Sequence, residues 1–177
     1  MMRLALWTLV GLFIAVAVHL ASILTMPYLA ARTAEHRLAT IAGDGSFHLL
    51  RPGEAILPMP DPAVVTAACR YDLSAGPVHV QVPTSLGFLS VSFYTPDGLN
   101  YYALNDRAVA TGAIELTVYT DVQLAEVRSR EGPDTAENLR IEAPQTAGLI
   151  TIRALAREAG ERPTLEALAA KATCKAG

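Results

Sequence analysis

Residues 88–105 of this chain read FLSVSFYTPDGLNYYALN and give the clearest indication of its fold. Apolar residues occupy every second position from Leu89 to Phe93, and serines stand between them. Such alternation is typical of a strand with one buried face, and Pro96-Asp97-Gly98 supplies the residues that a tight turn needs. The stretch therefore predicts a β-hairpin whose two strands cover residues 88–95 and 100–105.

The same period of two extends outward from this hairpin in both directions. It predicts half-buried strands at residues 64–73, 78–82, 114–118 and 150–153, with a short strand at 139–142. Turn residues Ser74-Ala75-Gly76-Pro77 separate the first two of these strands. Short, alternating strands at regular spacing are typical of antiparallel sheets that pack as a sandwich or a partly open barrel.

Two helices are expected beside the sheets. Thr120-Asp121-Val122-Gln123 has the pattern of a capping box, and it predicts a helix that ends at Gly132-Pro133 with Leu124 and Val127 facing the sheet. Pro163 suits the first turn of a last helix. The buried side of that helix is expected to consist of Leu165, Leu168, Ala169 and Ala172. The predicted fold class is α+β, mainly β: an antiparallel β-sandwich with two peripheral helices, preceded by one N-terminal transmembrane helix.

The N-terminal segment predicts that transmembrane helix. No charged residue lies between Arg3 and Arg32, and about 20 helical residues cover the roughly 30 Å hydrocarbon core of a bilayer. Trp7 and Tyr28 suit the two membrane interfaces. A cleaved signal peptide is the alternative, but its apolar region is expected to be shorter, about 7–15 residues. Residues 1–27 are therefore interpreted as an uncleaved transmembrane signal anchor.

The remaining chain divides into a stalk and a domain. Residues 28–45 predict a short stalk helix beyond a kink at Pro27, running to about Ala42, followed by a linker, and residues 46–177 a β-rich soluble domain. The distribution of positive charge is nearly balanced, with Arg3 on one side and Arg32 and Arg37 on the other. By the positive-inside rule, the two arginines after the span argue against export of the domain. Folded domains behind short leaders nevertheless commonly translocate.

One stripe of the anchor is expected to contact another helix. Gly11, Ala15, His19 and Ser22, with Thr8 before them, follow one another at steps of three or four residues. They therefore share one face, where small residues permit close approach and a polar group prefers a partner. The alternative is that these residues are ordinary for a membrane span and His19 lies near its interface.

Composition and motifs exclude several classes of function. The net charge is −3 and no basic run occurs, so no nucleic-acid partner is expected. The four histidines never fall at metal-ligand spacing, and no metal is expected. The chain lacks a nucleophile elbow, a phosphate loop and a dinucleotide fingerprint. We therefore expect no cofactor and no catalytic residue, which favours a protein that is not an enzyme.

The densest polar residues give a candidate binding site. Arg70 and Asp72 flank Tyr71 on one predicted strand, and Asp106 and Arg107 follow Asn105 after the hairpin. These side chains would line one cleft at an end of the sandwich and bind an anion through arginine. The alternative is that they form turns and pair with neighbouring strands.

The two cysteines are expected to form a disulfide. Cys69 lies in a predicted strand and Cys174 in the C-terminal tail, and two cysteines in an exported domain favour a bridge. The bridge would tie the last helix to the sheet. The alternative is a buried free thiol at Cys69 and an unrelated thiol in the tail.

A family resemblance rests on two strings of residues. Cys69-Arg70-Tyr71-Asp72-Leu73 and the stretch from Phe88 to Arg107 resemble domain-of-unknown-function family 1254, in particular its short, membrane-anchored alphaproteobacterial members. In larger relatives this domain is fused to a second β-rich domain, that of unknown-function family 1214. The resemblance implies that a separate chain carrying the family 1214 domain is a partner of this one. It supplies no catalytic residues, and the brevity of this chain leaves the activity of larger relatives in doubt.

Together these features predict a single-pass protein of the bacterial inner membrane. Its partners would be the lipid bilayer and a second subunit, and its β-sandwich would lie in the periplasm as an interaction or envelope accessory domain. The first alternative is a small-ligand-binding or hydrolase-like domain with a polar cleft. The second is a cytoplasmic domain with reduced cysteines.

Overall fold

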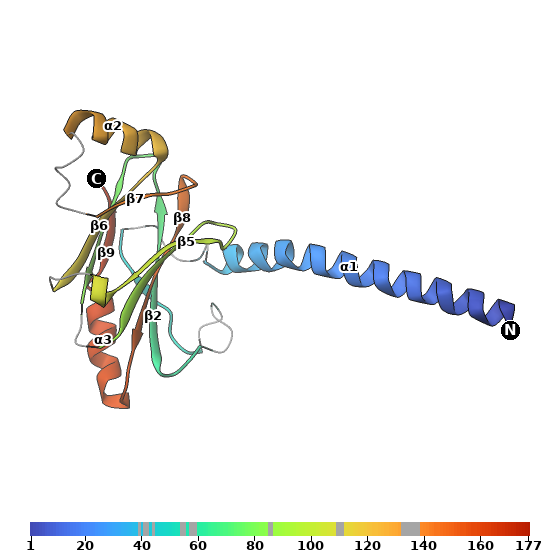
Figure 1. Ribbon diagram of the computed structural model, residues 1–177. Coiled ribbons are helices and arrows are strands. Elements are labelled where there is room, and N and C mark those ends of the chain that lie inside the picture. The colour runs from blue at the N-terminus through green and yellow to red at the C-terminus, as the bar shows by residue number, and fades with distance from the viewer. Residues whose placement is uncertain are drawn as a thin grey trace.

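The computed structural model describes residues 1–38, 40, 43, 45–53, 56, 60–84, 87–108, 112–131 and 139–177, with the backbone alone at residues 30–36 and 38. A long helix leads into a domain of two sheets (Figure 1). The elements are α1 Met2–Leu38, β1 His48–Leu49, β2 Val64–Asp72, β3 Val78–Pro83, β4 Leu89–Tyr94, β5 Asn100–Asn105, η1 Asp106–Ala108, β6 Ala113–Tyr119, α2 Asp121–Glu131, β7 Leu139–Glu142, β8 Ala147–Leu155, η2 Ala159–Glu161, α3 Arg162–Ala169 and β9 Thr173–Ala176.

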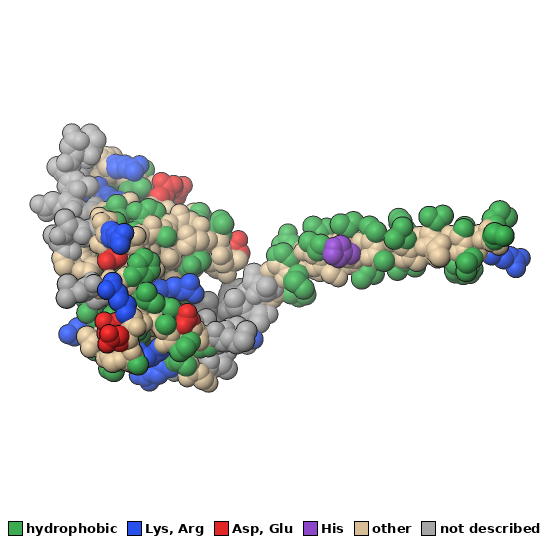
Figure 2. Space-filling view, turned by 60° about the horizontal axis from the view of Figure 1, so that its bottom comes forward, with side chains coloured by type: hydrophobic (Ala, Val, Ile, Leu, Met, Phe, Trp, Pro, Cys, Tyr) green, Lys and Arg blue, Asp and Glu red, His purple; other side chains and the backbone are tan. Residues whose placement is uncertain are grey.

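The helix α1 contains the predicted membrane span. Residues Met2–Leu29 are long and apolar enough to cross a membrane, and their most apolar 18-residue stretch has a mean hydropathy of 2.3. Hydrophobic side chains surround this part of α1 (Figure 2). The predicted stalk is helical from Tyr28 to Leu38, but it is not a separate helix, because α1 continues through Pro27 as one helix. Residues 39, 41 and 42, the end of the predicted stalk, lie outside the described residues.

The strands form two sheets that pack face to face. The five-stranded sheet has the order β1-β2-β8-β4-β5, and the four-stranded sheet has the order β7-β6-β3-β9. The predicted hairpin is present as β4 and β5, which pair antiparallel from Ser90–Asn105 to Tyr94–Asn100. The β-sandwich and its two peripheral helices α2 and α3 are confirmed.

One prediction about the sheets is wrong. Strand β7 runs parallel to β6, with Leu116 opposite Leu139 and Tyr119 opposite Glu142. The chain leaves β6 into α2 and returns in the same direction, and such a crossover is what a parallel pair requires. The sequence pattern predicted β6, α2 and β7 correctly. The pattern of each strand by itself does not specify whether the two strands pair parallel or antiparallel.

The core lies between the sheets and follows the alternation of the sequence. Its largest fully buried side chains are Phe93, Leu73, Leu89, Ile114, Leu124, Ile150, Ile152, Val65, Val78, Val80, Val82 and Val91. Thr117 and Tyr119 are also buried, although their positions in β6 face outward. Glu115 on the same face is exposed, but β6 lies between β3 and β7, so Thr117 has a cross-strand neighbour on each side. One of these is His79, whose Nδ1 lies 2.9 Å from Thr117 Oγ1.

The C-terminal region differs from the prediction. Helix α3 ends at Ala169, and Ala172 follows the helix instead of belonging to it. Cys174 lies in β9, an edge strand that pairs antiparallel with β3, and not in an irregular tail. Strands β1 and β9 have two and four residues, and an alternating pattern over so few positions gives no usable signal.

The predicted capping box of α2 is confirmed in both directions. The Gln123 backbone amide donates to Thr120 Oγ1 at 3.2 Å, and Gln123 Oε1 accepts from the Thr120 amide at 3.0 Å. The Gln123 side chain also donates to the Leu73 carbonyl at 2.9 Å, so it joins the helix start to the end of β2. Leu124, the next residue of α2, is buried on the side of the helix that contacts β6 and β7.

We expect Thr120→Ala to lower the free energy of unfolding of the domain by about 1 kcal/mol, because the first turn of α2 loses its cap. Denaturant titration of the full-length chain in detergent measures the change. Ser129→Ala is the matched control, because that hydroxyl donates to the Glu126 carbonyl near the exposed end of α2. An equal loss in both variants would show that the cap contributes nothing specific.

Candidate functional site

The structure does not bring the predicted cleft residues together. Asp72 pairs with Ala147 at the start of β8, whereas Arg153, near the end of β8, pairs with Ser90. Ser90 is in turn opposite Asn105, the residue before Asp106 and Arg107. Because β8 lies between β2 and β4, Asp72 and the Asp106–Arg107 pair occupy opposite ends of the five-stranded sheet. The prediction of one shared cleft is therefore wrong. A binding role for Arg70 and Asp72, or for Asp106 and Arg107, stays a prediction.

Both halves of the cluster act in turns. Asp72 Oδ1 accepts a hydrogen bond from the Ser74 amide at 2.8 Å, and this backbone bond lowers the pKa of the Asp72 carboxyl. Asn105 Oδ1 accepts from the Arg107 amide at 3.2 Å. Side chains that bond to an amide two residues ahead form Asx turns. Among the described residues, the buried Oδ1 of Asp106 has no hydrogen-bond partner.

Arg70 and Asp72 line a hollow beside the seam between the sheets. Its volume is about 340 Å³. It is lined by Gly43, Gly45, Arg70, Tyr71, Asp72, Val78, Cys174, Lys175 and Ala176. The hollow therefore lies where the chain enters the domain after α1, between β2 of one sheet and β9 of the other. Its rim carries both positive and negative side chains.

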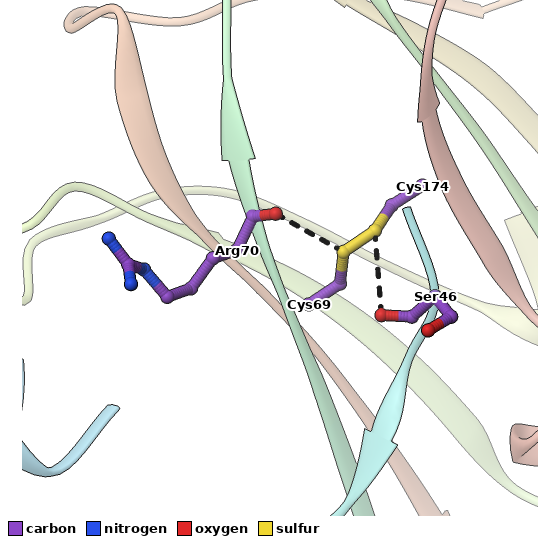
Figure 3. The surroundings of a disulfide bond; sticks show 4 residues. All are labelled: Ser46, Cys69, Arg70 and Cys174. Carbon is purple, nitrogen blue, oxygen red and sulfur yellow. Dashed lines mark hydrogen bonds between the residues drawn. A yellow bond between two sulfur atoms is a disulfide. The ribbon is translucent and has the colours of Figure 1, made fainter. Parts of the chain in front are cut away.

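The disulfide lies beside this hollow, because Cys174 is one of the lining residues. Cys69 on β2 and Cys174 on β9 are bonded across a sequence separation of 105 residues, with their Cα atoms 6.6 Å apart. That separation lies within the usual range for disulfides. The sulfur of Cys174 lies 3.9 Å from the Ser46 carbonyl oxygen, while the Arg70 side chain points away from the bridge (Figure 3). The bridge therefore joins the two sheets, and the prediction that it ties the last helix to the sheet is wrong.

Two tyrosines, the buried Tyr71 and the partly buried Tyr101, meet on the inner face of the five-stranded sheet. The hydroxyl oxygens of Tyr71 and Tyr101 are 2.7 Å apart, although β8 and β4 separate their strands. The pairing of β4 with β5 shifts between Phe93 and Tyr94, so Tyr101 is the extra residue of a β-bulge. The bulge aims Tyr101 inward, and Gly148 on β8, opposite Tyr71, leaves room for the Tyr71 ring.

Sequence reasoning missed this tyrosine pair. The tandem Tyr101-Tyr102 after the hairpin turn was the only available signal, because strict alternation would have placed Tyr101 on the outer face. The bulge that reverses this placement depends on the register between β4 and β5, which no local pattern specifies. The rings of Tyr101 and Tyr102 also pack on Phe93, at centroid distances of 6.1 Å and 6.0 Å.

The tyrosine pair predicts a pH dependence of stability. Burial raises the pKa of both Tyr71 and Tyr101 above the ordinary value of about 10. A raised folded-state pKa gives stability that is complete below pH about 10 and is lost as the pH rises further. We expect a Tyr71→Phe/Tyr101→Phe variant to lose less stability than wild type between pH 9 and 11. Urea titration across that range measures this, Tyr28→Phe is the control, and equal slopes in all three proteins would contradict it.

The predicted contact face lies on the exposed part of α1. A Cβ added at Gly11 would have no atom within 4 Å, and all four residues Gly11, Ala15, His19 and Ser22 are exposed. The Ser22 hydroxyl donates to the Val18 carbonyl at 2.8 Å, within the helix. The face is available to a second helix, and its occupation stays a prediction.

The fold defines a class of protein: a two-sheet β-sandwich, closed by a disulfide between its sheets and carried behind an apolar helix. Within that class the chain belongs to the family described as "Protein of unknown function (DUF1254)", whose model matches residues 46–176. The family predicted from residues 69–73 and 88–107 is thereby confirmed. A comparison with curated proteins found no match to this sequence.

Two solved structures are similar to this chain. The crystal structure of the VPA0106 protein from Vibrio parahaemolyticus has a TM-score of 0.59 at 12% identity, over 85% of this chain and 36% of that one. An uncharacterized protein from Burkholderia cenocepacia has a TM-score of 0.44 at 15% identity, over 64% of this chain and 32% of that one. The chain thus spans about a third of the length of these proteins. The first likeness shows that its fold occurs within a longer polypeptide.

Proposed function

We propose that this protein is a single-pass accessory subunit of the bacterial inner membrane that presents its β-sandwich to the periplasm. The observation that carries the proposal is the combination of a fully exposed apolar helix with a domain closed by a disulfide. An apolar helix of 28 residues is stable when lipid surrounds it. A disulfide persists in an oxidising compartment, and the periplasm is one.

The role of an interaction subunit is supported by the size of the similar structures. This fold makes up 36% of the Vibrio parahaemolyticus protein. A second chain, carrying the family 1214 domain, would supply an equivalent of the rest of the Vibrio parahaemolyticus protein. The membrane holds both subunits in one plane, which raises their effective concentration. The helix face of Gly11, Ala15, His19 and Ser22 would add a contact inside the bilayer.

Purification from native membranes tests this function. A C-terminally tagged full-length chain, solubilised in mild detergent, is expected to recover one other polypeptide in a fixed ratio. A double variant Gly11→Leu/Ala15→Leu should lower that ratio, because larger side chains hold a second helix away, whereas Leu12→Ile/Val16→Leu on the neighbouring face should not. Recovery of the tagged chain without a stoichiometric partner would overturn the proposal.

A second candidate function rests on the hollow beside the disulfide. Its volume of about 340 Å³ is sufficient for a small ligand, and Arg70 and Asp72 could bind an anionic and a cationic group of it. A hydrolase-like activity would need further groups at the same place. Thermal-shift screening of the full-length chain against small metabolites tests this function. Asp72→Asn should remove any stabilisation that is found, and an equal shift in wild type and variant would exclude the hollow as its site.

A further inference from the structure

The disulfide holds the segment by which the chain enters the domain, residues 45–46, which we call the entry segment. The Cys174 amide donates to the Gly45 carbonyl at 3.0 Å, and Ser46 forms an isolated antiparallel bridge with Thr173. The sulfur of Cys174 lies 3.9 Å from the Ser46 carbonyl oxygen (Figure 3). The entry segment therefore lies along the edge of β9 that faces away from β3, and the bond to Cys69 fastens β9 and this segment to β2.

Strand β9 contributes little apolar burial of its own. Of its four residues only Cys174 is buried, while Lys175 and Ala176 are exposed. Strand β3, by contrast, contributes three buried valines to the core and pairs with β6 along six residues. Elements with few buried apolar contacts open locally at a lower free energy than the rest of a domain. Once the bond between the two sulfurs is broken, β9 is therefore able to open while β3 stays in its sheet.

The hollow beside the disulfide gives a reductant access to it. Cys174 lines this hollow and is 3% exposed, whereas Cys69 is 0% exposed. One thiolate of a dithiol reductant can therefore attack the sulfur of Cys174 and form a mixed disulfide, and Cys69 leaves as a thiolate. The second thiolate of the reductant then displaces Cys174. Two electrons have passed from the dithiol to the bridge, so the reductant leaves as a disulfide and both cysteines take up a proton.

We propose that the Cys69–Cys174 bond is a redox-sensitive latch: its reduction by a dithiol frees β9 together with the entry segment, while the rest of the sandwich stays folded. This inference goes beyond the proposed function, because it does not depend on a partner subunit. Release uncovers the edge of β3 over Val78–Gln81, where β9 pairs in the oxidised chain. It also removes the wall that β9 supplies to the hollow, so a ligand of the hollow would bind the oxidised form alone.

Hydrogen exchange of the full-length chain in detergent tests the latch. Dithiothreitol is added to the folded protein, and mass spectrometry follows exchange in peptides that contain β9 and in peptides from β8, which lies inside the other sheet. Loss of the bridge lowers the stability of the whole domain, so exchange should rise in both strands. The rise in β9 should exceed the rise in β8 by about tenfold or more, because β9 then opens alone. The Cys69→Ala/Cys174→Ala variant should show the same pattern without dithiothreitol.

Two glycine variants give a second readout, the rate at which dithiothreitol reduces the bridge. Gly45 and Gly53 have positive φ angles of +80° and +93°, so alanine is strained at either position. A Cβ at Gly45 would lie 3.0 Å from Cγ of Lys175 on β9, whereas one at Gly53 would have no atom of the described residues within 4 Å. Gly45→Ala should speed reduction about tenfold, because opening of the entry segment with β9 relieves the strain, and Gly53→Ala should leave the rate near that of wild type. Equal rises of exchange in β9 and β8, no rise in β9, or equal reduction rates in the two glycine variants would overturn the proposal.

Discussion

Removal of the Cys69–Cys174 disulfide is expected to lower the free energy of unfolding of the domain by about 2–5 kcal/mol. The bridge closes a sequence separation of 105 residues, and in the chain-entropy model a loop of about 100 residues corresponds to the upper part of that range. It also connects β2 of one sheet with β9 of the other. Without it, β9 is held by four residue pairs with β3 and by its contacts with residues 45 and 46.

The double variant Cys69→Ala/Cys174→Ala is the protein to measure, because it leaves no thiol to react. Its thermal unfolding in detergent should begin well below that of wild type. A reducing agent provides the internal control: it should lower the wild-type transition to that of the variant and leave the variant unaffected. Identical transitions for all samples would show that the two sheets hold together without the bridge.

Gly148→Ala is expected to destabilise the domain by about 3 kcal/mol, the upper end of the range for overpacked cores. A Cβ at position 148 would lie 2.6 Å from the carbonyl oxygen of Tyr94 and would also meet the ring of Tyr71. The Tyr94 carbonyl belongs to the backbone of β4 and cannot move aside without disturbing the sheet. The Tyr71 ring cannot move without losing its hydrogen bond to Tyr101.

Gly160→Ala is the matched control for this substitution, since a Cβ at that glycine has no atom within 4 Å. Urea unfolding of the two full-length variants should therefore separate them clearly, with Gly160→Ala close to wild type. Addition of Tyr71→Leu to Gly148→Ala should recover part of the loss. Equal stability of the two glycine variants would show that β8 can shift to accept the methyl group.

Much of the fold could be predicted because neighbouring residues carry the signal. The alternation from Leu89 to Phe93, with the turn at Pro96-Asp97-Gly98, defines the hairpin locally. The capping box at Thr120 is likewise a property of four successive residues. The membrane span of α1 can be predicted without tertiary contacts, because the length of its apolar run is compared with the thickness of a bilayer.

The errors share a different physical origin. The direction of β7 and the position of β9 depend on which strands meet across long stretches of chain. The same holds for the cleft: Asp72 is the last residue of β2 and Asp106 follows the last residue of β5, but the pairing of these strands through β8 and β4 places them at opposite ends of the sheet. The Tyr71–Tyr101 pair depends on a bulge, which shifts a side chain to the other face without any change in the local pattern.

The most direct measurement of the central claim is the accessibility of Cys174 to a membrane-impermeant thiol reagent. Cells and spheroplasts are labelled with and without prior reduction, and a Cys69→Ala variant, which leaves Cys174 as the single cysteine of the chain, supplies the unbridged reference. Because Cys174 is buried in the edge strand β9, its labelling requires local opening of that strand and is followed to completion. We expect wild type to be labelled in spheroplasts only after reduction, and the variant to be labelled there without it. That result would support a disulfide-closed domain on the periplasmic side of the membrane. Labelling of wild type only after lysis, with no reductant needed, would contradict both the bridge and the location.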